Sequence, residues 1–84
     1  MNVEVRFFAS LREVTGTGSL RLSMPEDAGF EALMAALEQR LGPVAVAALR
    51  GENVRLARNQ DLVAPPFRLA EGDELAFLPP VTGG

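Results

Sequence analysis

The sequence predicts one small α+β domain, in which a mixed sheet of about five strands packs against one main helix, with one or two short helices besides. Two patterns carry this prediction. Apolar residues recur at helical spacing over residues 30–41, and they alternate with polar residues over residues 3–7 and 74–77. The chain has 84 residues, which is enough for a single domain with a modest core.

The N-terminal segment is predicted to form two antiparallel strands joined by a short helix. Residues 3–7 alternate apolar and polar side chains, which indicates a first strand with one buried face. Ser10 and Glu13 have the spacing of a capping box, so a helical turn is predicted from there to about Val14. Residues 19–23 alternate again and predict the second strand.

The main helix is predicted next. Pro-Glu-Asp at residues 25–27 forms a start signal, because acidic side chains favour the positive end of the helix dipole. The apolar stripe that follows has the spacing of one helical face and consists of Phe30, Leu33, Met34, Leu37 and Leu41. Gly42 and Pro43 end this helix, and residues 44–49 form either another short helix or an apolar connector.

The C-terminal half is predicted to supply three more strands. Residues 54–58 indicate a third strand, and residues 62–63 indicate a short fourth one. A tight turn at residues 71–73 precedes a final strand in which Leu and Phe alternate with Glu and Ala. Pro79-Pro80 ends that strand, because proline lacks the N–H that a sheet needs. The predicted order is therefore ββαβββ.

Composition excludes several classes of function. The net charge is -3 and the charges are scattered, so no basic run is present to follow a nucleic acid backbone. The chain has neither an apolar stretch approaching 18 residues nor a signal peptide, and we expect a soluble, cytoplasmic protein without a membrane partner. His, Cys, Lys, Tyr and Trp are all absent. Without the commonest general base, nucleophiles and metal ligands, neither a metal site nor autonomous catalysis is expected.

The chemistry is predicted to reside in the C-terminal tail. We expect residues 1–78 to form the domain and residues 79–84 to form a flexible tail of Pro79, Pro80, Val81, Thr82, Gly83 and Gly84. Fully extended, six residues reach about 20 Å. Two terminal glycines fit a narrow channel and leave the Gly84 carboxylate open to attack. Gly-Gly alone is a weak signal, because chain ends are often rich in glycine, but here it follows a strand and a Pro-Pro stop.

Alternation also predicts an exposed apolar patch near the root of this tail. If Phe7 and Phe77 face the helix, then Phe8 and Leu78 face the other side of the sheet. Leu62, beside the inward candidate Val63, is expected to face that side too. The patch is interpreted as a partner-docking surface, although scattered surface hydrophobes are common in proteins.

Several segments together resemble a known family over the whole chain. They are residues 5–13 followed by Gly16, Asn59-Gln60 ahead of residues 62–63, residues 72–74, and Phe-Leu-Pro-Pro-Val-Thr-Gly-Gly at 77–84. These segments resemble the small subunit of molybdopterin synthase, the MoaD family, and the last of them is highly specific. The related thiamine carriers of the ThiS type share the Gly-Gly end but usually lack the Pro-Pro before it. The resemblance implies a β-grasp, ubiquitin-like fold.

The resemblance also implies a mechanism. An E1-like, MoeB-like enzyme adenylates the Gly84 carboxylate with ATP and magnesium, and a sulfur donor such as a cysteine desulfurase converts it to a thiocarboxylate. The tail then enters the large subunit, MoaE, and gives its sulfur to cyclic pyranopterin monophosphate to form molybdopterin. Two carriers and two large subunits make the complex, a heterotetramer. This chain is then a sulfur-donating subunit that binds no cofactor, and the active-site side chains belong to its partners.

The same resemblance implies that Phe8, Leu62 and Leu78 are the hydrophobic contact residues, which coincide with the patch derived from alternation. The family often has Phe where this chain has Leu78. Three alternatives remain open at this stage. The first is a sulfur carrier for another product, such as thiamine thiazole or a tungsten cofactor. The second is a ubiquitin-like modifier joined to lysines through Gly84. The third is a β-grasp binding module that uses only its patch.

Overall fold

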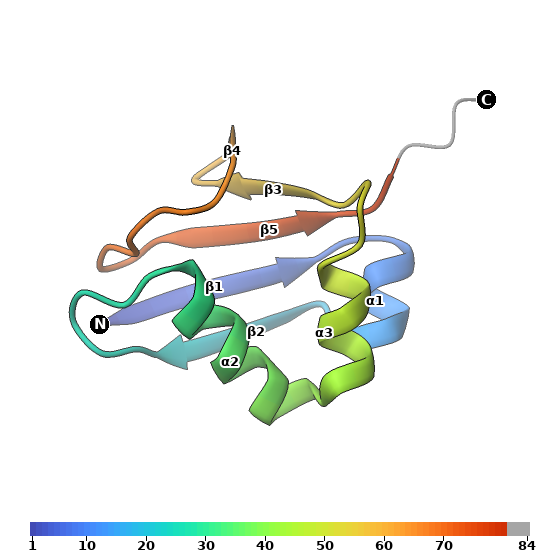
Figure 1. Ribbon diagram of the computed structural model, residues 1–84, viewed down its shortest axis with the longest axis horizontal. Coiled ribbons are helices and arrows are strands. Elements are labelled where there is room, and N and C mark those ends of the chain that lie inside the picture. The colour runs from blue at the N-terminus through green and yellow to red at the C-terminus, as the bar shows by residue number, and fades with distance from the viewer. Residues whose placement is uncertain (81–84) are drawn as a thin grey trace.

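The computed structural model of the protein describes residues 1–80 of its 84 (Figure 1). The elements follow in the order β1 (Asn2–Phe7), α1 (Ser10–Thr15), β2 (Ser19–Ser23), α2 (Phe30–Leu41), α3 (Pro43–Leu49), β3 (Arg55–Arg58), β4 (Asp61–Val63) and β5 (Glu74–Leu78). The predicted order ββαβββ is confirmed, and α1 and α3 are the short helices added to it.

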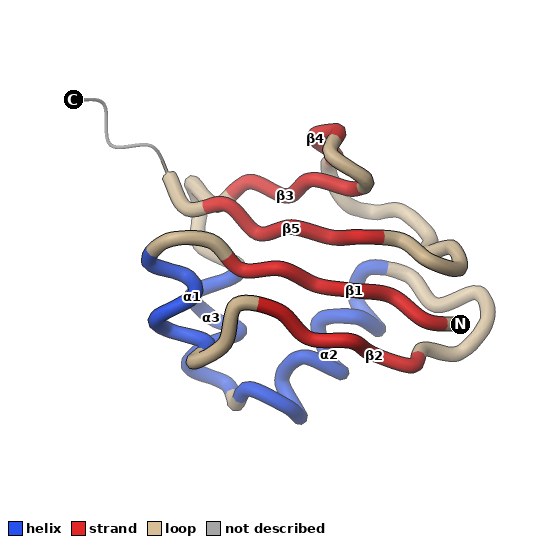
Figure 2. Tube along the Cα trace, turned by 180° about the vertical axis from the view of Figure 1, so that it is seen from behind, coloured by secondary structure: helices blue, strands red, loops and turns tan. Residues whose placement is uncertain are grey.

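The strands form one mixed sheet in the order β2-β1-β5-β3-β4. Its central strands β1 and β5 run parallel, and each of the other neighbouring pairs is antiparallel. The helices lie against one face of the sheet, and Figure 2 shows the other face bare of helices along the described chain. This is the β-grasp, ubiquitin-like arrangement, so the predicted fold class is confirmed.

The core lies between the covered face of the sheet and α2. Val5 and Leu75 pair in register across β1 and β5 and are fully buried. Phe7 and Phe77, the next inward pair, stack with their ring centroids 6.0 Å apart. Leu37 of the predicted apolar stripe is fully buried from the helix side. Each such side chain contributes about 1.5–3 kcal/mol through removal of apolar area from water, which makes this face the main source of stability.

The capping box predicted from Ser10 is wrong. Ala9 is the N-cap, with a φ of 50°, and Ser10 is already the first residue of α1 and makes no capping hydrogen bond. The chain leaves β1 through a tight turn, in which the Leu11 N–H donates to the Phe8 carbonyl and the Arg12 N–H donates to the Ala9 carbonyl. Because this turn starts the helix one residue earlier than a Ser10 cap requires, Ser10 lies inside the helix and cannot cap it.

The helix start predicted at residues 25–27 is also wrong. α2 begins at Phe30, after an N-cap residue in extended conformation. Two backbone hydrogen bonds, from the Phe30 N–H to the Phe67 carbonyl and from the Leu69 N–H to the Ala28 carbonyl, join this entry to a distant segment. Such pairing needs an extended backbone, so the helix can begin only where the paired segment ends.

The segment that the sequence left open between helix and connector is helical. α3 spans Pro43–Leu49, starts with proline in its first turn, and buries Ala45, Val46 and Leu49. The tight turn at residues 71–73 is confirmed, and its Gly72 has a φ of 80°. β5 then ends at Leu78, so Pro79 and Pro80 follow directly at the end of this central strand. Among the described residues, every helix falls short of the length and apolarity needed to cross a membrane.

Candidate docking face and carrier tail

The face of the sheet without helices carries the three apolar residues singled out by alternation. The Phe8 N–H donates to the Phe77 carbonyl at 3.2 Å, which extends the parallel pairing of β1 and β5 by one residue. Phe8 therefore lies beside Leu78, on the side opposite the buried Phe7. Phe8 is 42% exposed and Leu78 is half-buried, so both remain available to a partner.

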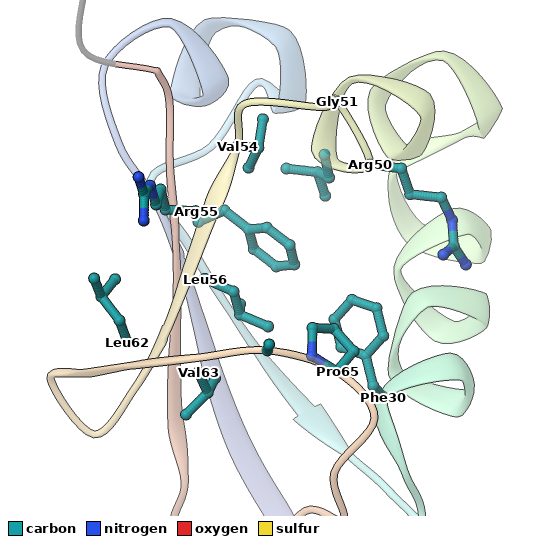
Figure 3. A pocket seen from close by; sticks show the side chains of 12 residues that line it. Phe30, Arg50, Gly51, Val54, Arg55, Leu56, Leu62, Val63 and Pro65 are labelled. Carbon is teal, nitrogen blue, oxygen red and sulfur yellow. The ribbon is translucent and has the colours of Figure 1, made fainter.

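Leu62 reaches the same face from the edge of the sheet. It pairs in register with Ala57 of β3, and Ala57 pairs with Ala76 of β5, so the three residues form one row. Leu62 is 64% exposed. Figure 3 shows Leu62 and Arg55 standing away from the apolar side chains gathered between β3 and the helices. We call Phe8, Leu62 and Leu78, with Ala57 and Ala76 between them, the docking face.

Charged groups border the docking face, and the sequence reasoning did not single them out. Arg55 pairs in register with Leu78 and therefore borders the apolar patch directly beside that residue. Farther along β1, the Arg6 Nε lies 3.5 Å from Glu4 Oε2 and 3.4 Å from Glu74 Oε2. Alternation along β3 was the signal that could have placed Arg55, because it is two residues from Ala57.

The tail leaves the domain beside a groove at the end of the docking face. The groove has a volume of about 1240 Å³ and is lined by Glu52, Asn53, Val54, Arg55, Leu62, Leu78, Pro79 and Pro80. Pro79 and Pro80 thus lie where the sequence predicts the root of the tail. The remaining predicted tail residues, Val81, Thr82, Gly83 and Gly84, lie outside the described residues.

A buried carboxylate supports the hairpin that carries Leu62. Asp73 Oδ2 accepts hydrogen bonds from Arg58 Nε at 3.0 Å and from the Ala70 N–H at 2.8 Å, and Oδ1 accepts one from Asn59 Nδ2 at 3.0 Å. Burial by itself raises the pKa of Asp73, but these hydrogen bonds to the charged form outweigh it. The pKa of Asp73 therefore lies below its ordinary value, and the group is a stable anion at neutral pH.

A second hollow, of about 600 Å³, lies on the other side of β3 and β4 (Figure 3). Its walls are mostly apolar and include Phe30, Leu56 and Val63, and Arg50 lies at its rim. Arg50 is engaged by Glu31, since Nη2 lies 2.7 Å from Oε1, and this hydrogen bond lowers the pKa of Glu31. The hollow therefore offers few polar groups with which to orient a substrate.

The described part of the chain holds no group of side chains that could bind a metal ion. Across residues 1–80, no three side chains of the types that commonly hold a metal ion come together as a group. The described geometry is that of an exposed apolar face with Pro79 and Pro80 at one end of it.

Comparisons with known proteins cover nearly the whole chain. The model of the ThiS family matches residues 5–84. The chain is 38% identical to the molybdopterin synthase sulfur carrier subunit of Escherichia coli (strain K12), over 98% of this chain and 99% of that protein. It is 36% identical to the protein of the same name from Homo sapiens, over 98% and 93%.

Solved structures agree in fold. SAMP1 of Haloferax volcanii, a small archaeal modifier protein, superposes with a TM-score of 0.81 and 29% identity, and both chains are covered completely. Subunits 1 and 2 of the molybdopterin-converting factor from Helicobacter pylori 26695 form a protein-protein complex, one chain of which matches with a TM-score of 0.70 and 28% identity over both full lengths.

Proposed function

Since the chain belongs to the ThiS family, we propose that it is the sulfur carrier subunit of a molybdopterin synthase. The observation that carries this proposal is the full-length similarity to proteins of that name from a bacterium and from an animal. The geometry supports it, because β5 leads directly into the prolines at the root of the tail, beside an exposed apolar face.

The working group in this proposal is the carboxylate of Gly84. A carboxylate is a poor electrophile, so a MoeB-like enzyme first joins it to AMP from ATP, with magnesium, and pyrophosphate leaves. The persulfide of a sulfur donor such as a cysteine desulfurase then displaces AMP to give an acyl disulfide, and a second thiol reduces that disulfide bond, which releases the thiocarboxylate. Glycine at both final positions lets this end enter narrow active sites, since no side chain widens the strand.

The docking face is proposed to bind the large subunit, MoaE. A structural relative forms a complex of subunits 1 and 2 of a molybdopterin-converting factor, which is the support for a partner of this kind. Phe8, Leu62 and Leu78 would lose exposed apolar area on docking, and apolar burial is the main driving force of such association. The tail, which starts beside Leu78, would then extend into the partner.

The proposal divides the chemistry between the subunits. The carrier has no His, Cys, Lys or Tyr, so acids and bases that act on cyclic pyranopterin monophosphate are assigned to the large subunit. Two carriers and two large subunits would form the heterotetramer. A cytoplasmic location follows from the same proposal, because activation of the carrier consumes ATP.

Intact mass spectrometry tests this function directly. The chain would be incubated with a MoeB-like enzyme, ATP, magnesium and a sulfur donor, and compared with a variant that lacks Gly84. We expect the full chain to gain the mass of one sulfur in place of one oxygen, and the shortened chain to gain nothing. A full chain that stays unchanged while a known carrier gains sulfur in the same mixture would contradict the proposal.

A second candidate function is that of a ubiquitin-like protein modifier. The observation that favours it is the TM-score of 0.81 to a small archaeal modifier protein. Such a modifier would form stable conjugates of higher mass through Gly84, whereas a carrier would accumulate as the thiocarboxylate. The chain contains no Lys, so lysine-linked polymers of the chain with itself are impossible in either case.

A further inference from the structure

The hairpin that carries Leu62 is weakly held by the sheet itself. β4 has only the three residues Asp61–Val63, lies at the edge, and pairs only with β3 within residues 1–80. Its residues are exposed or at most half-buried, so little apolar area fixes them. A strand this short at a sheet edge is marginal unless other contacts hold it.

The connection between β3 and β4 is also conformationally demanding. Asn59 and Gln60 are its two residues, and their φ angles are 50° and 74°. Positive φ at both positions matches the right-handed twist of a two-residue hairpin. Asn tolerates this region better than most residues, but Gln does not, so surrounding contacts must compensate for the strain.

Asp73, the residue before β5, supplies these contacts. Its two oxygens accept from Arg58 and Asn59, the last residue of β3 and the first of the turn. Asn59 is tied further to Glu74, whose N–H donates to Asn59 Oδ1 at 2.9 Å and whose carbonyl accepts from the Asn59 N–H at 2.8 Å. Together these bonds join the turn of the hairpin to a central strand of the sheet.

The bonded group and the docking face lie on opposite sides of the hairpin. Arg58 pairs in register with Leu75 on the covered side, and its guanidinium lies 5.4 Å from the centre of the Phe67 ring. Leu62 pairs with Ala57 on the free side. Asp73 is only 5% exposed, so a partner on the docking face would touch Leu62 but not Asp73.

We propose that Asp73 is a positioning residue for docking, which acts through Arg58 and Asn59 to hold the β3–β4 hairpin and thereby keeps Leu62 in the plane of the docking face. This inference rests on the proposed function and adds to it a residue outside the contact surface. Removal of the carboxylate leaves the turn held only by its bonds to Glu74, so that Leu62 is less well ordered before the partner binds, and affinity falls accordingly.

Two variants remove the bonds in different ways. Asp73→Asn keeps the size of the side chain but loses the charge, and Asn59→Gly loses the side-chain bonds while it still permits positive φ. Val46→Ala, a truncation in the buried face of α3, serves as a destabilised control far from the hairpin. Affinity for the molybdopterin synthase large subunit of the same organism would be measured by calorimetry at a temperature where all chains are folded. We expect about fivefold weaker binding for both hairpin variants and unchanged binding for the control.

A double-mutant cycle separates positioning from general loosening. In a Leu62→Ala background, Asp73→Asn should cause no further loss, because the side chain that it positions is gone. In a Phe8→Ala background the fivefold loss should persist. Unchanged affinity in both hairpin variants, or an equal loss with and without Leu62, would overturn the assignment. A wild-type chain that fails to bind the large subunit would overturn the proposed function, and this inference with it.

Discussion

The two faces of the sheet are made from alternating residues of the same strands, and they differ in how far their side chains are buried. On the covered face, Phe7 and Phe77 are no more than 2% exposed and stack against each other. On the free face, their sequence neighbours Phe8 and Leu78 remain accessible. A single residue step therefore separates a side chain that holds the fold from one that is available to a partner, and substitutions at neighbouring positions can test the two roles separately.

The largest effect on stability is expected from the covered face. Leu37→Ala removes a fully buried side chain between α2 and the sheet, and it should lower the free energy of unfolding by about 2–5 kcal/mol. Urea denaturation measures this loss. Gln39→Ala, on the exposed side of the same helix, is the matched control and should change stability by less than about 0.5 kcal/mol. Equal losses of stability in the two variants would show that the apolar stripe of α2 does not contribute to the core as assigned.

The sharpest test of the comparison lies at the end of β1. Phe8→Arg should leave the melting temperature nearly unchanged, yet weaken binding to the large subunit by about tenfold or more, because it replaces an apolar contact of the docking face with a charge. Phe7→Arg should instead unfold the chain, because it buries a charge without a partner.

Circular dichroism and calorimetry on the two Phe variants separate stability from affinity. If Phe8→Arg proved as unstable as Phe7→Arg, the assignment of the two faces would be wrong. If it bound as tightly as the wild type, the fold would stand but the docking face would have to be sought elsewhere.

Local patterns were sufficient to predict both faces. The spacing of the apolar residues in α2 and the alternation in β1 and β5 report directly on which side chains are inward, because period and burial are properties of one segment. The opposite orientations of Phe7 and Phe8 needed nothing more. The predicted tail residues 81–84 lie outside the described residues, and their role stays a prediction.

Features that depend on distant segments were not predicted correctly. The helix start at residues 25–27 failed because Ala28 and Phe30 bond to residues 67–69, which no local signal announces. Asp73 was noticed only as part of a turn, because its partners Arg58 and Asn59 lie 15 and 14 residues away. Tertiary contacts of this kind override local propensity.

Acid should act on the attachment of the hairpin. The pKa of Asp73 is lowered in the folded chain, so its contribution to stability is fully present above the unfolded pKa of about 4 and is lost as pH falls through the lower folded pKa. Urea denaturation at pH 7 and near pH 3 should therefore show that wild type and Asp73→Asn differ clearly at neutral pH and differ less in acid. A difference that is independent of pH would mean that the charge on Asp73 contributes nothing.

The smallest effect is expected from the charges of the free face. Arg6 lies between Glu4 and Glu74 in partly exposed ion pairs, so Arg6→Gln should cost less than about 1 kcal/mol of stability, and even this difference should vanish in high salt. Thermal unfolding at low and high ionic strength measures it. A loss of stability as large as that of Leu37→Ala would contradict the different roles assigned to the two faces. It would make a partly exposed side chain on the free face as important to the fold as one in the core.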